Sequence, residues 1–210
     1  MVDVLDLSFV KEYLDKLDSA REVLIKRSRE LTQMSKRVIS YCLRGQMDNA
    51  YEELTRLSKA YEELISALSD SAELQHSQLL YSVVAEYVEA LTFFEVLRNG
   101  KLPSVGEVKT HVIPYVLGLA DLIGELKRYS LELVRLGKYN ESMKYLKLSE
   151  DIYESLTSLT YPDVILPGLR RKLDIYRKVI DDWKEFLLDL ISRKELKDLL
   201  RKHYGSVNEL

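Results

Sequence analysis

The chain has 210 residues, of which 46% are hydrophobic and 31% are charged, and its formal net charge is −3. This length fits one large domain with a sizeable core, and the acidic balance excludes a protein whose whole surface is basic. Cys42 is the single cysteine, which excludes an intrachain disulfide and a zinc site made of thiolates. The N-terminus has no signal-peptide pattern and no run of about 18 uncharged apolar residues occurs, so we expect a soluble, cytoplasmic protein without a membrane span.

Apolar residues recur at helical spacing along the chain, and no segment shows the sustained alternation of a strand. The sequence therefore predicts an all-α fold, a single bundle of six or seven helices that occupies residues 1–210, with residues 1–7 and 205–210 frayed. The predicted helices are, in chain order, a long one at 8–44, then 47–69, 71–98, a short piece at 105–109, 114–136, 141–159, 169–191 and 193–204.

The first predicted helix carries an excess of positive charge. Seven basic and two acidic residues lie between Arg21 and Arg44. One interpretation is a solvated face whose cations pair with acids of neighbouring helices. The other is a strip that binds phosphates, because Arg and Lys supply affinity for nucleic acid without regard to sequence.

The stretch 118–126, Gly-Leu-Ala-Asp-Leu-Ile-Gly-Glu-Leu, is unusual for a helix because it holds two glycines and two carboxylates. Each glycine in a helix costs about 0.5–1 kcal/mol relative to alanine. Asp121 and Glu125 lie one turn apart and share a face. We therefore expect Gly118 and Gly124 to leave room beside these acids for something that approaches the backbone closely.

A second pair of carboxylates, Glu86 and Glu89, lies on one face of the preceding predicted helix. If this face meets that of Asp121 and Glu125, four carboxylates converge, and a cation is needed to offset their repulsion. A site made only of oxygen ligands selects Mg²⁺ or Mn²⁺ over zinc. The spacing leaves two interpretations open: a metal site that activates water and stabilises charge on a phosphoryl group, or acids that are only solvated.

Other kinds of site find no support in the sequence. It contains neither of the glycine-rich motifs that bind phosphates. Three histidines, widely separated, are too few for a multi-histidine zinc site. Neither glutamate of the second pair is followed by the histidine that a di-iron site requires.

Four segments resemble the translin superfamily. Residues 21–37, Arg-Glu-Val-Leu-Ile-Lys-Arg-Ser-Arg-Glu-Leu-Thr-Gln-Met-Ser-Lys-Arg, are similar to its opening helix. Residues 86–90, Glu-Tyr-Val-Glu-Ala, and the stretch 118–126 resemble signatures of its catalytic branch, translin-associated factor X. Residues 169–174 fit its final long helix more loosely. Together these segments span most of the chain.

This resemblance implies an all-helical fold that assembles into a hollow homo-octamer and binds single-stranded RNA, with single-stranded DNA as an alternative. It further implies that the chain is a Mg²⁺-dependent endoribonuclease. Carried over by motif, Glu86, Glu89 and Asp121 would be metal-binding catalytic acids, and Glu125 would support them. The basic face of the first helix would contribute to RNA binding through Arg21, Arg27, Lys36 and Arg37.

Two other functions stay open at this point. One is an oligomer that binds RNA or single-stranded DNA without catalysis, in which the acids are structural or solvated. The other is that of an all-α nucleoside triphosphate pyrophosphatase, a class of enzyme that also binds Mg²⁺ through several carboxylates.

Overall fold

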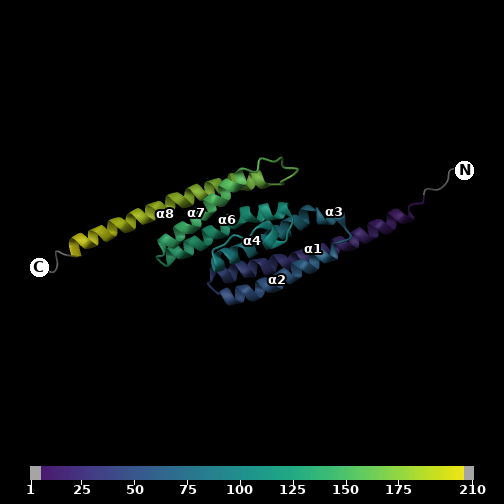
Figure 1. Ribbon diagram of the computed structural model, residues 1–210, viewed down its shortest axis with the longest axis horizontal. Coiled ribbons are helices and arrows are strands. Elements are labelled where there is room, and N and C mark those ends of the chain that lie inside the picture. The colour runs from purple at the N-terminus through teal and green to yellow at the C-terminus, as the bar shows by residue number, and fades with distance from the viewer. Residues whose placement is uncertain (1–5, 206–210) are drawn as a thin grey trace. The chain divides into compact units, whose positions relative to one another are not determined.

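The computed structural model describes residues 6–205, and every regular element in that range is a helix (Figure 1). The all-α prediction is thereby confirmed. The helices are α1 (Ser8–Leu43), α2 (Met47–Ala67), α3 (Ala72–Gln75), α4 (Gln78–Asn99), α5 (Val105–Val108), α6 (Val112–Arg135), α7 (Tyr139–Thr157) and α8 (Leu169–Gly205).

The chain divides into two compact units, one ending at Leu119 and the other beginning at Ala120. The division falls inside α6, so a continuous helix belongs partly to each unit. Each unit is described by itself below. The single domain over residues 1–210 stays a prediction, and the predicted frayed ends fall mainly outside the described residues.

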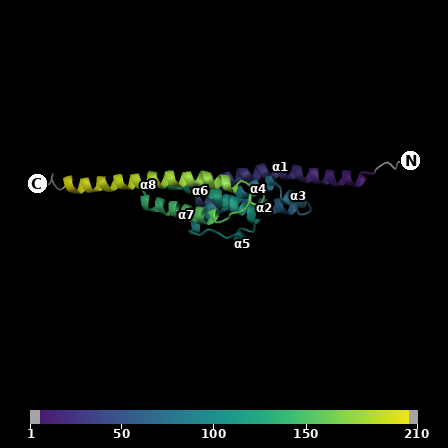
Figure 2. The ribbon, with the colours of Figure 1, turned by 90° about the horizontal axis from the view of Figure 1, so that it is seen from above.

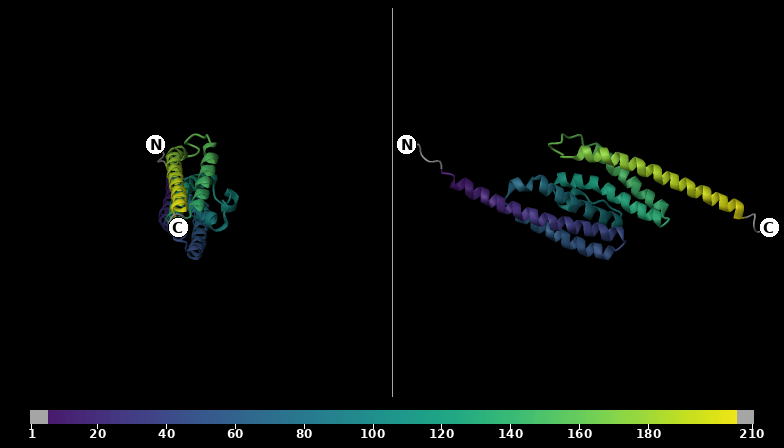
Figure 3. Two further views of the ribbon diagram at one scale, coloured as in Figure 1. Left: turned by 90° about the vertical axis from the view of Figure 1, so that its left-hand side faces the viewer. Right: turned by 180° about the vertical axis from the view of Figure 1, so that it is seen from behind.

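The N-terminal unit is built around α1, α2 and α4, which pack against one another; Figure 3 shows α1 and α2 side by side. Leu24, Leu31, Val38 and Cys42 form the buried stripe of α1 at helical spacing. Over half of the residues of α4 are buried, as expected of a helix surrounded by others. Burial raises the pKa of the Cys42 thiol to about 12, so this cysteine stays protonated in the folded protein.

The C-terminal unit contains the rest of α6 together with α7 and α8, and Figure 2 shows the loop that leads from α7 to α8. Trp183 of α8 is 1% exposed and anchors this unit. Its indole Nε1 donates a hydrogen bond to Ser130 Oγ at 3.2 Å, and the Ser130 hydroxyl lies 2.5 Å from that of Ser142. The buried polar groups of α6, α7 and α8 thus satisfy one another.

The predicted helix at 71–98 is wrong as one element. It is broken between α3 and α4, where Ser77 adopts an extended backbone conformation and caps α4 by accepting a hydrogen bond from the backbone N–H of Leu80 at 3.3 Å. Serine competes for backbone hydrogen bonds and so favours a helix end over a helix interior.

The predicted break between 191 and 193 is also wrong. The last helix, α8, is continuous from Leu169 to Gly205. Neither glycine nor proline occurs between its first and last residues, so nothing in the sequence interrupts its backbone hydrogen bonds. No helix in residues 6–205 is long and apolar enough to cross a bilayer.

Candidate functional site

The first predicted pair of carboxylates lies on α4, in the N-terminal unit. Glu86 and Glu89 are half-buried, and Phe93, one turn further along the same face, is completely buried. This face of α4 is therefore not a solvent face. Glu86 Oε2 is buried and has no hydrogen-bond partner among the described residues. A buried carboxylate oxygen without a partner is costly, which makes it a natural ligand for a cation.

Gly118 lies where α6 packs against α4. A Cβ atom at this position would stand 2.6 Å from the backbone carbonyl oxygen of Ala85 and 2.7 Å from Cβ of Val88. Only glycine lets the two helix backbones come this close. The element that approaches the backbone closely at Gly118 is thus α4, and it fills the room that the sequence led us to expect beside this glycine.

Asp121, in the C-terminal unit, is engaged by α8. Its Oδ1 accepts a hydrogen bond from the ammonium of Lys172, which also forms an ion pair with it, and lies 3.4 Å from the hydroxyl of Tyr176. The Asp121 side chain is 22% exposed. Its negative charge is therefore balanced within the unit while one edge stays open to a ligand.

Glu125 is held within its own helix. Both of its carboxylate oxygens accept from Nη1 of Arg128, at 2.8 and 2.9 Å. The side chain of Glu125 is 15% exposed and that of Arg128 is 61% exposed. The guanidinium orients this carboxylate at the edge of α6.

Gly124 differs from Gly118 in its surroundings. A Cβ atom here would meet only the side chain of Tyr176, with the hydroxyl at 3.5 Å and Cε1 at 3.6 Å. These are ordinary van der Waals distances. Gly124 therefore faces one aromatic side chain, and a small amount of room is present beside it.

The four acids belong to different units, Glu86 and Glu89 to one and Asp121 and Glu125 to the other. Within residues 6–205, no three His, Cys, Asp or Glu side chains form a group that could hold a metal ion. The convergence of the four carboxylates around a cation stays a prediction from the sequence.

The predicted RNA-binding residues of α1 fall into two kinds. Arg27 pairs with Glu63 of α2 at 2.9 Å, and Arg37 pairs at 2.6 Å with Glu53, whose side chain is only 8% exposed. These two arginines fix α1 to α2, as the plainer interpretation of the basic face expects.

The other two predicted residues form no ion pair with another helix in the described part of the chain. Arg21 pairs only within α1, at 3.2 Å from Glu22 and 3.7 Å from Asp18. Lys36 is exposed and forms no ion pair among the described residues, and Lys26 and Arg29 share this property. These side chains leave α1 with positive charge facing solvent.

Sequence reasoning missed Lys172 and Tyr176, which both contact Asp121. They lie one turn apart on α8, so they share a face, and this spacing is the one signal that could have paired them. The segment 169–174 stands out in the sequence only by its resemblance, and nothing in it indicates an acid as the partner of Lys172. The sequence also did not indicate that Glu53 is buried and pairs with Arg37. Its helix is rich in Glu and Lys, and nothing distinguishes this glutamate from its exposed neighbours.

The fold is that of an all-helical protein with a long basic first helix and with acids on its central helices. The sequence model of the Translin family matches residues 19–194. The chain therefore belongs to the Translin family.

Two relatives and two solved structures support this assignment. An uncharacterised protein, MJ0175, of Methanocaldococcus jannaschii is 31% identical over 94% of this chain and 88% of its own length. The translin-associated protein X homolog of Schizosaccharomyces pombe is 27% identical over 83% of this chain and 81% of its own length.

Among solved structures, AfC3PO is 29% identical with a TM-score of 0.80, and AfC3PO in complex with duplex RNA is 28% identical with a TM-score of 0.78; each match covers 88% of this chain and 96% of that one. Apo-NeC3PO, at 24% identity, has the same fold, with a TM-score of 0.79 over 90% of this chain and 98% of that one.

Proposed function

We propose that this protein is a Mg²⁺-dependent endoribonuclease that binds single-stranded RNA and cleaves its phosphodiester bonds. Membership of the Translin family, a relative named translin-associated protein X homolog and the likeness to AfC3PO solved with duplex RNA support RNA as the substrate. The observation that carries the catalytic part is Glu86 Oε2, a buried carboxylate oxygen without a hydrogen-bond partner among the described residues.

The metal ligands in this proposal are Glu86, Glu89 and Asp121, with Glu125 in support. All donors are carboxylate oxygens, which suits Mg²⁺ or Mn²⁺. The ion, when bound, lowers the pKa of a bound water and stabilises negative charge on the phosphate. A cation beside Glu86 would also remove the cost of its unpartnered oxygen.

The surrounding residues hold these acids in place. Lys172 and the Tyr176 hydroxyl orient Asp121 from α8, and Arg128 orients Glu125 from the next turn of α6. The Lys172 side chain is 33% exposed, so its ammonium is accessible to a phosphate oxygen of the RNA as well. Side chains that position a carboxylate and also attract phosphate contribute to both binding and catalysis.

RNA binding is proposed to involve the basic face of α1, including Arg21, Arg27, Lys36 and Arg37. Lys36 is the strongest of these candidates because it is exposed and has no acid partner among the described residues. Each phosphate contact releases counterions, so we expect affinity to fall as salt concentration rises.

We also propose that the protein is a homo-oligomer, an octamer by resemblance. Both ends of the described chain carry exposed apolar side chains, among them Phe9 at 78% exposure on α1 and Leu199 at 64% on α8. Phe9 lies on α1 beside the exposed apolar residues Val10 and Leu14, and contiguous apolar exposure of this kind marks surfaces that associate. Mass photometry of the purified protein tests the assembly size directly.

The catalytic proposal is tested by incubating the full-length protein with labelled single-stranded RNA and Mg²⁺. We expect Glu86→Gln to reduce cleavage by about a hundredfold or more, because it removes a charged metal ligand worth several kcal/mol to the transition state. The matched control is Glu95→Gln, a half-buried glutamate of the same helix that accepts a hydrogen bond from Asn99. Equal cleavage by wild type and Glu86→Gln would contradict the proposal.

A second candidate function is RNA binding without catalysis. The pairing of Asp121 with Lys172 and of Glu125 with Arg128 favours it, since both carboxylates are already neutralised by the protein's own cations. This second function predicts that the protein cleaves no RNA, whichever metal ion is added. It also predicts RNA binding that weakens with salt and that Asp121→Asn leaves unchanged.

A further inference from the structure

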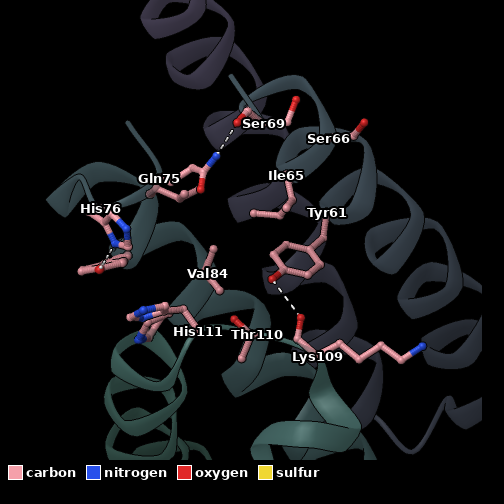
Figure 4. Close-up of a pocket in the computed structure, with 13 residues that line it drawn as sticks. Tyr61, Ile65, Ser66, Ser69, Gln75, His76, Val84, Lys109, Thr110 and His111 are labelled. Atoms are coloured by element: carbon pink, nitrogen blue, oxygen red, sulfur yellow. Dashed lines mark hydrogen bonds between the residues drawn. The ribbon is translucent and has the colours of Figure 1, made fainter. Parts of the chain in front are cut away.

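A cavity of about 580 Å³ lies within the N-terminal unit (Figure 4). Its walls come from the end of α2, from α3 and the start of α4, and from the segment between α5 and α6. This volume lies in the range of pockets that bind small organic ligands. None of the residues so far assigned to catalysis or to RNA binding lines it.

One wall of the cavity is a cluster of aromatic rings. Tyr81 and His111 are stacked with ring centroids 5.5 Å apart and planes 16° apart, and His76 meets both rings edge-on. His76 Nδ1 and the Tyr81 hydroxyl are 3.0 Å apart, within hydrogen-bonding distance. Tyr81 is buried while both imidazoles are exposed, so the two imidazoles are accessible to a ligand.

Tyr61 supplies a second aromatic surface, from α2. It stacks on Tyr87 with centroids 4.4 Å apart, and its hydroxyl donates to the backbone carbonyl of Lys109 at 3.4 Å. Lys109 has φ of 56°, the only positive φ among non-glycine residues of the described chain. Such backbone conformations are costly and concentrate at binding sites. The ring of Tyr61 is thus held in place by two contacts before any ligand arrives.

The polar groups of the cavity favour a neutral or anionic ligand. Gln75 Nε2 donates to the backbone carbonyls of Leu68 at 2.8 Å and Ser69 at 2.9 Å. Its amide oxygen is therefore the group it offers to a ligand. Among the thirteen residues that line the cavity there is one lysine, Lys109, and there are two histidines, but neither Asp nor Glu. In a chain with more acids than bases, a lining without a carboxylate indicates a site that accepts negative charge.

We infer that this cavity binds a single nucleotide, with its base between the aromatic walls and its phosphate beside His76 and His111. Base–aromatic stacking contributes about 1–3 kcal/mol per base and tolerates any base, and imidazoles at the rim supply donors to a phosphate. The nucleotide comes either from solution or from an unpaired position of an RNA strand. Only the second source rests on the proposed RNA binding.

The first test measures binding of AMP, GMP, CMP and UMP to the full-length protein by isothermal titration calorimetry. EDTA is present, so the result does not depend on cleavage. Ribose 5-phosphate and inorganic phosphate serve as probes without a base. We expect the monophosphates to bind about tenfold or more tightly than ribose 5-phosphate, which lacks the stacking surface. Equal binding of ribose 5-phosphate, or no binding of any monophosphate, would overturn the inference.

The site is located with a pair of variants at the end of α2. Ser66 lines the cavity and is exposed, so Ser66→Trp should fill the cavity without affecting folding and abolish nucleotide binding. Ala67, its exposed neighbour, does not line the cavity, and Ala67→Trp should bind as wild type does. Loss of binding in both variants, or in neither, would place the nucleotide elsewhere.

Histidine NMR signals give an independent readout, because the chain has only three histidines. Addition of AMP should shift the imidazole signals of His76 and His111 and leave those of His203 unchanged. Competition by single-stranded RNA for bound AMP identifies the strand as the source of the nucleotide, and its absence identifies the free nucleotide. A shift confined to His203 would contradict the assignment.

Discussion

The two glycines of α6 look alike in the sequence and differ in the structure. Gly118 faces α4, where an added Cβ would stand 2.6 Å from a backbone carbonyl oxygen. Gly124 faces only the side chain of Tyr176, at distances of 3.5 Å and above. The first glycine is required by a helix–helix contact, whereas the second leaves room next to a tyrosine that also contacts Asp121. A helix can therefore carry glycine for two unrelated reasons within two turns.

The largest expected effect in this comparison is that of Gly118→Ala. A Cβ against the backbone of α4 cannot be relieved by moving a side chain alone, so we expect the free energy of unfolding to fall by about 3 kcal/mol. Urea denaturation followed by circular dichroism measures this loss. The control is Gly106→Ala, since Gly106 has nothing within 4 Å of an added Cβ. A Gly118→Ala variant as stable as wild type would remove the distinction between the two glycines.

Next comes Gly124→Leu, which we expect to reduce the free energy of unfolding by about 2 kcal/mol. The leucine would extend beyond Cβ into the ring of Tyr176 and displace it from Asp121. The double variant Gly124→Leu/Tyr176→Ala makes space for the leucine and should recover part of the loss. The same denaturation assay applies, and a double variant less stable than either single one would argue against contact with Tyr176 as the cause.

A smaller effect of opposite sign is expected for Gly124→Ala. The added methyl group would meet Tyr176 at ordinary contact distance, while the helix loses a glycine. We therefore expect stability to rise by roughly 0.5 kcal/mol, at the lower end of the difference in helix propensity. A thermal melt of this variant beside Gly118→Ala provides the most direct comparison of the two positions, and a lowered melting temperature would show that Gly124 is tightly packed as well.

The smallest effect on stability concerns Lys172, which pairs with Asp121 beside Gly124. Because both side chains are partly exposed, Lys172→Gln should cost less than about 1 kcal/mol. Without the ammonium, Asp121 should become a better ligand, and Mn²⁺ affinity measured by electron paramagnetic resonance should rise by up to about fivefold. Lys178→Gln, on an exposed position of the same helix, is the control. Unchanged Mn²⁺ affinity would show that Lys172 does not compete with the ion.

That the elements are helices, and where most of them lie, could be predicted from the sequence because the apolar residues repeat at helical spacing. The bounds of α1 and α2 differ from the predicted ones by at most two residues. The two wrong predictions, a continuous helix at 71–98 and a break between 191 and 193, both occur at serines. Ser77 caps a helix inside what looked like one element, whereas Ser192 lies within α8 without ending it. Whether a serine caps a helix depends on the path of the chain around it, which the local sequence does not specify.

The candidate site could be predicted only in part. The acids were found because carboxylates at helical spacing are visible in a single segment. Their partners were not, since Lys172 is 51 residues away from Asp121, and an ion pair over that separation depends on how α8 packs. The role of Gly118 was likewise hidden, because a sequence shows that a glycine is present but not which backbone approaches it.

Because Cys42 is buried, the rate at which a reagent labels its thiol can be used to measure partial unfolding of the protein. A thiol reagent attacks the thiolate, and this thiol is 0% exposed with its pKa raised to about 12, so labelling of the folded protein requires α1 to open. Because the C-terminal unit has no cysteine, unfolding confined to that unit leaves the thiol unlabelled. The labelling rate at neutral pH, set beside the loss of helical circular dichroism, therefore separates the opening of one unit from that of the other without any added probe.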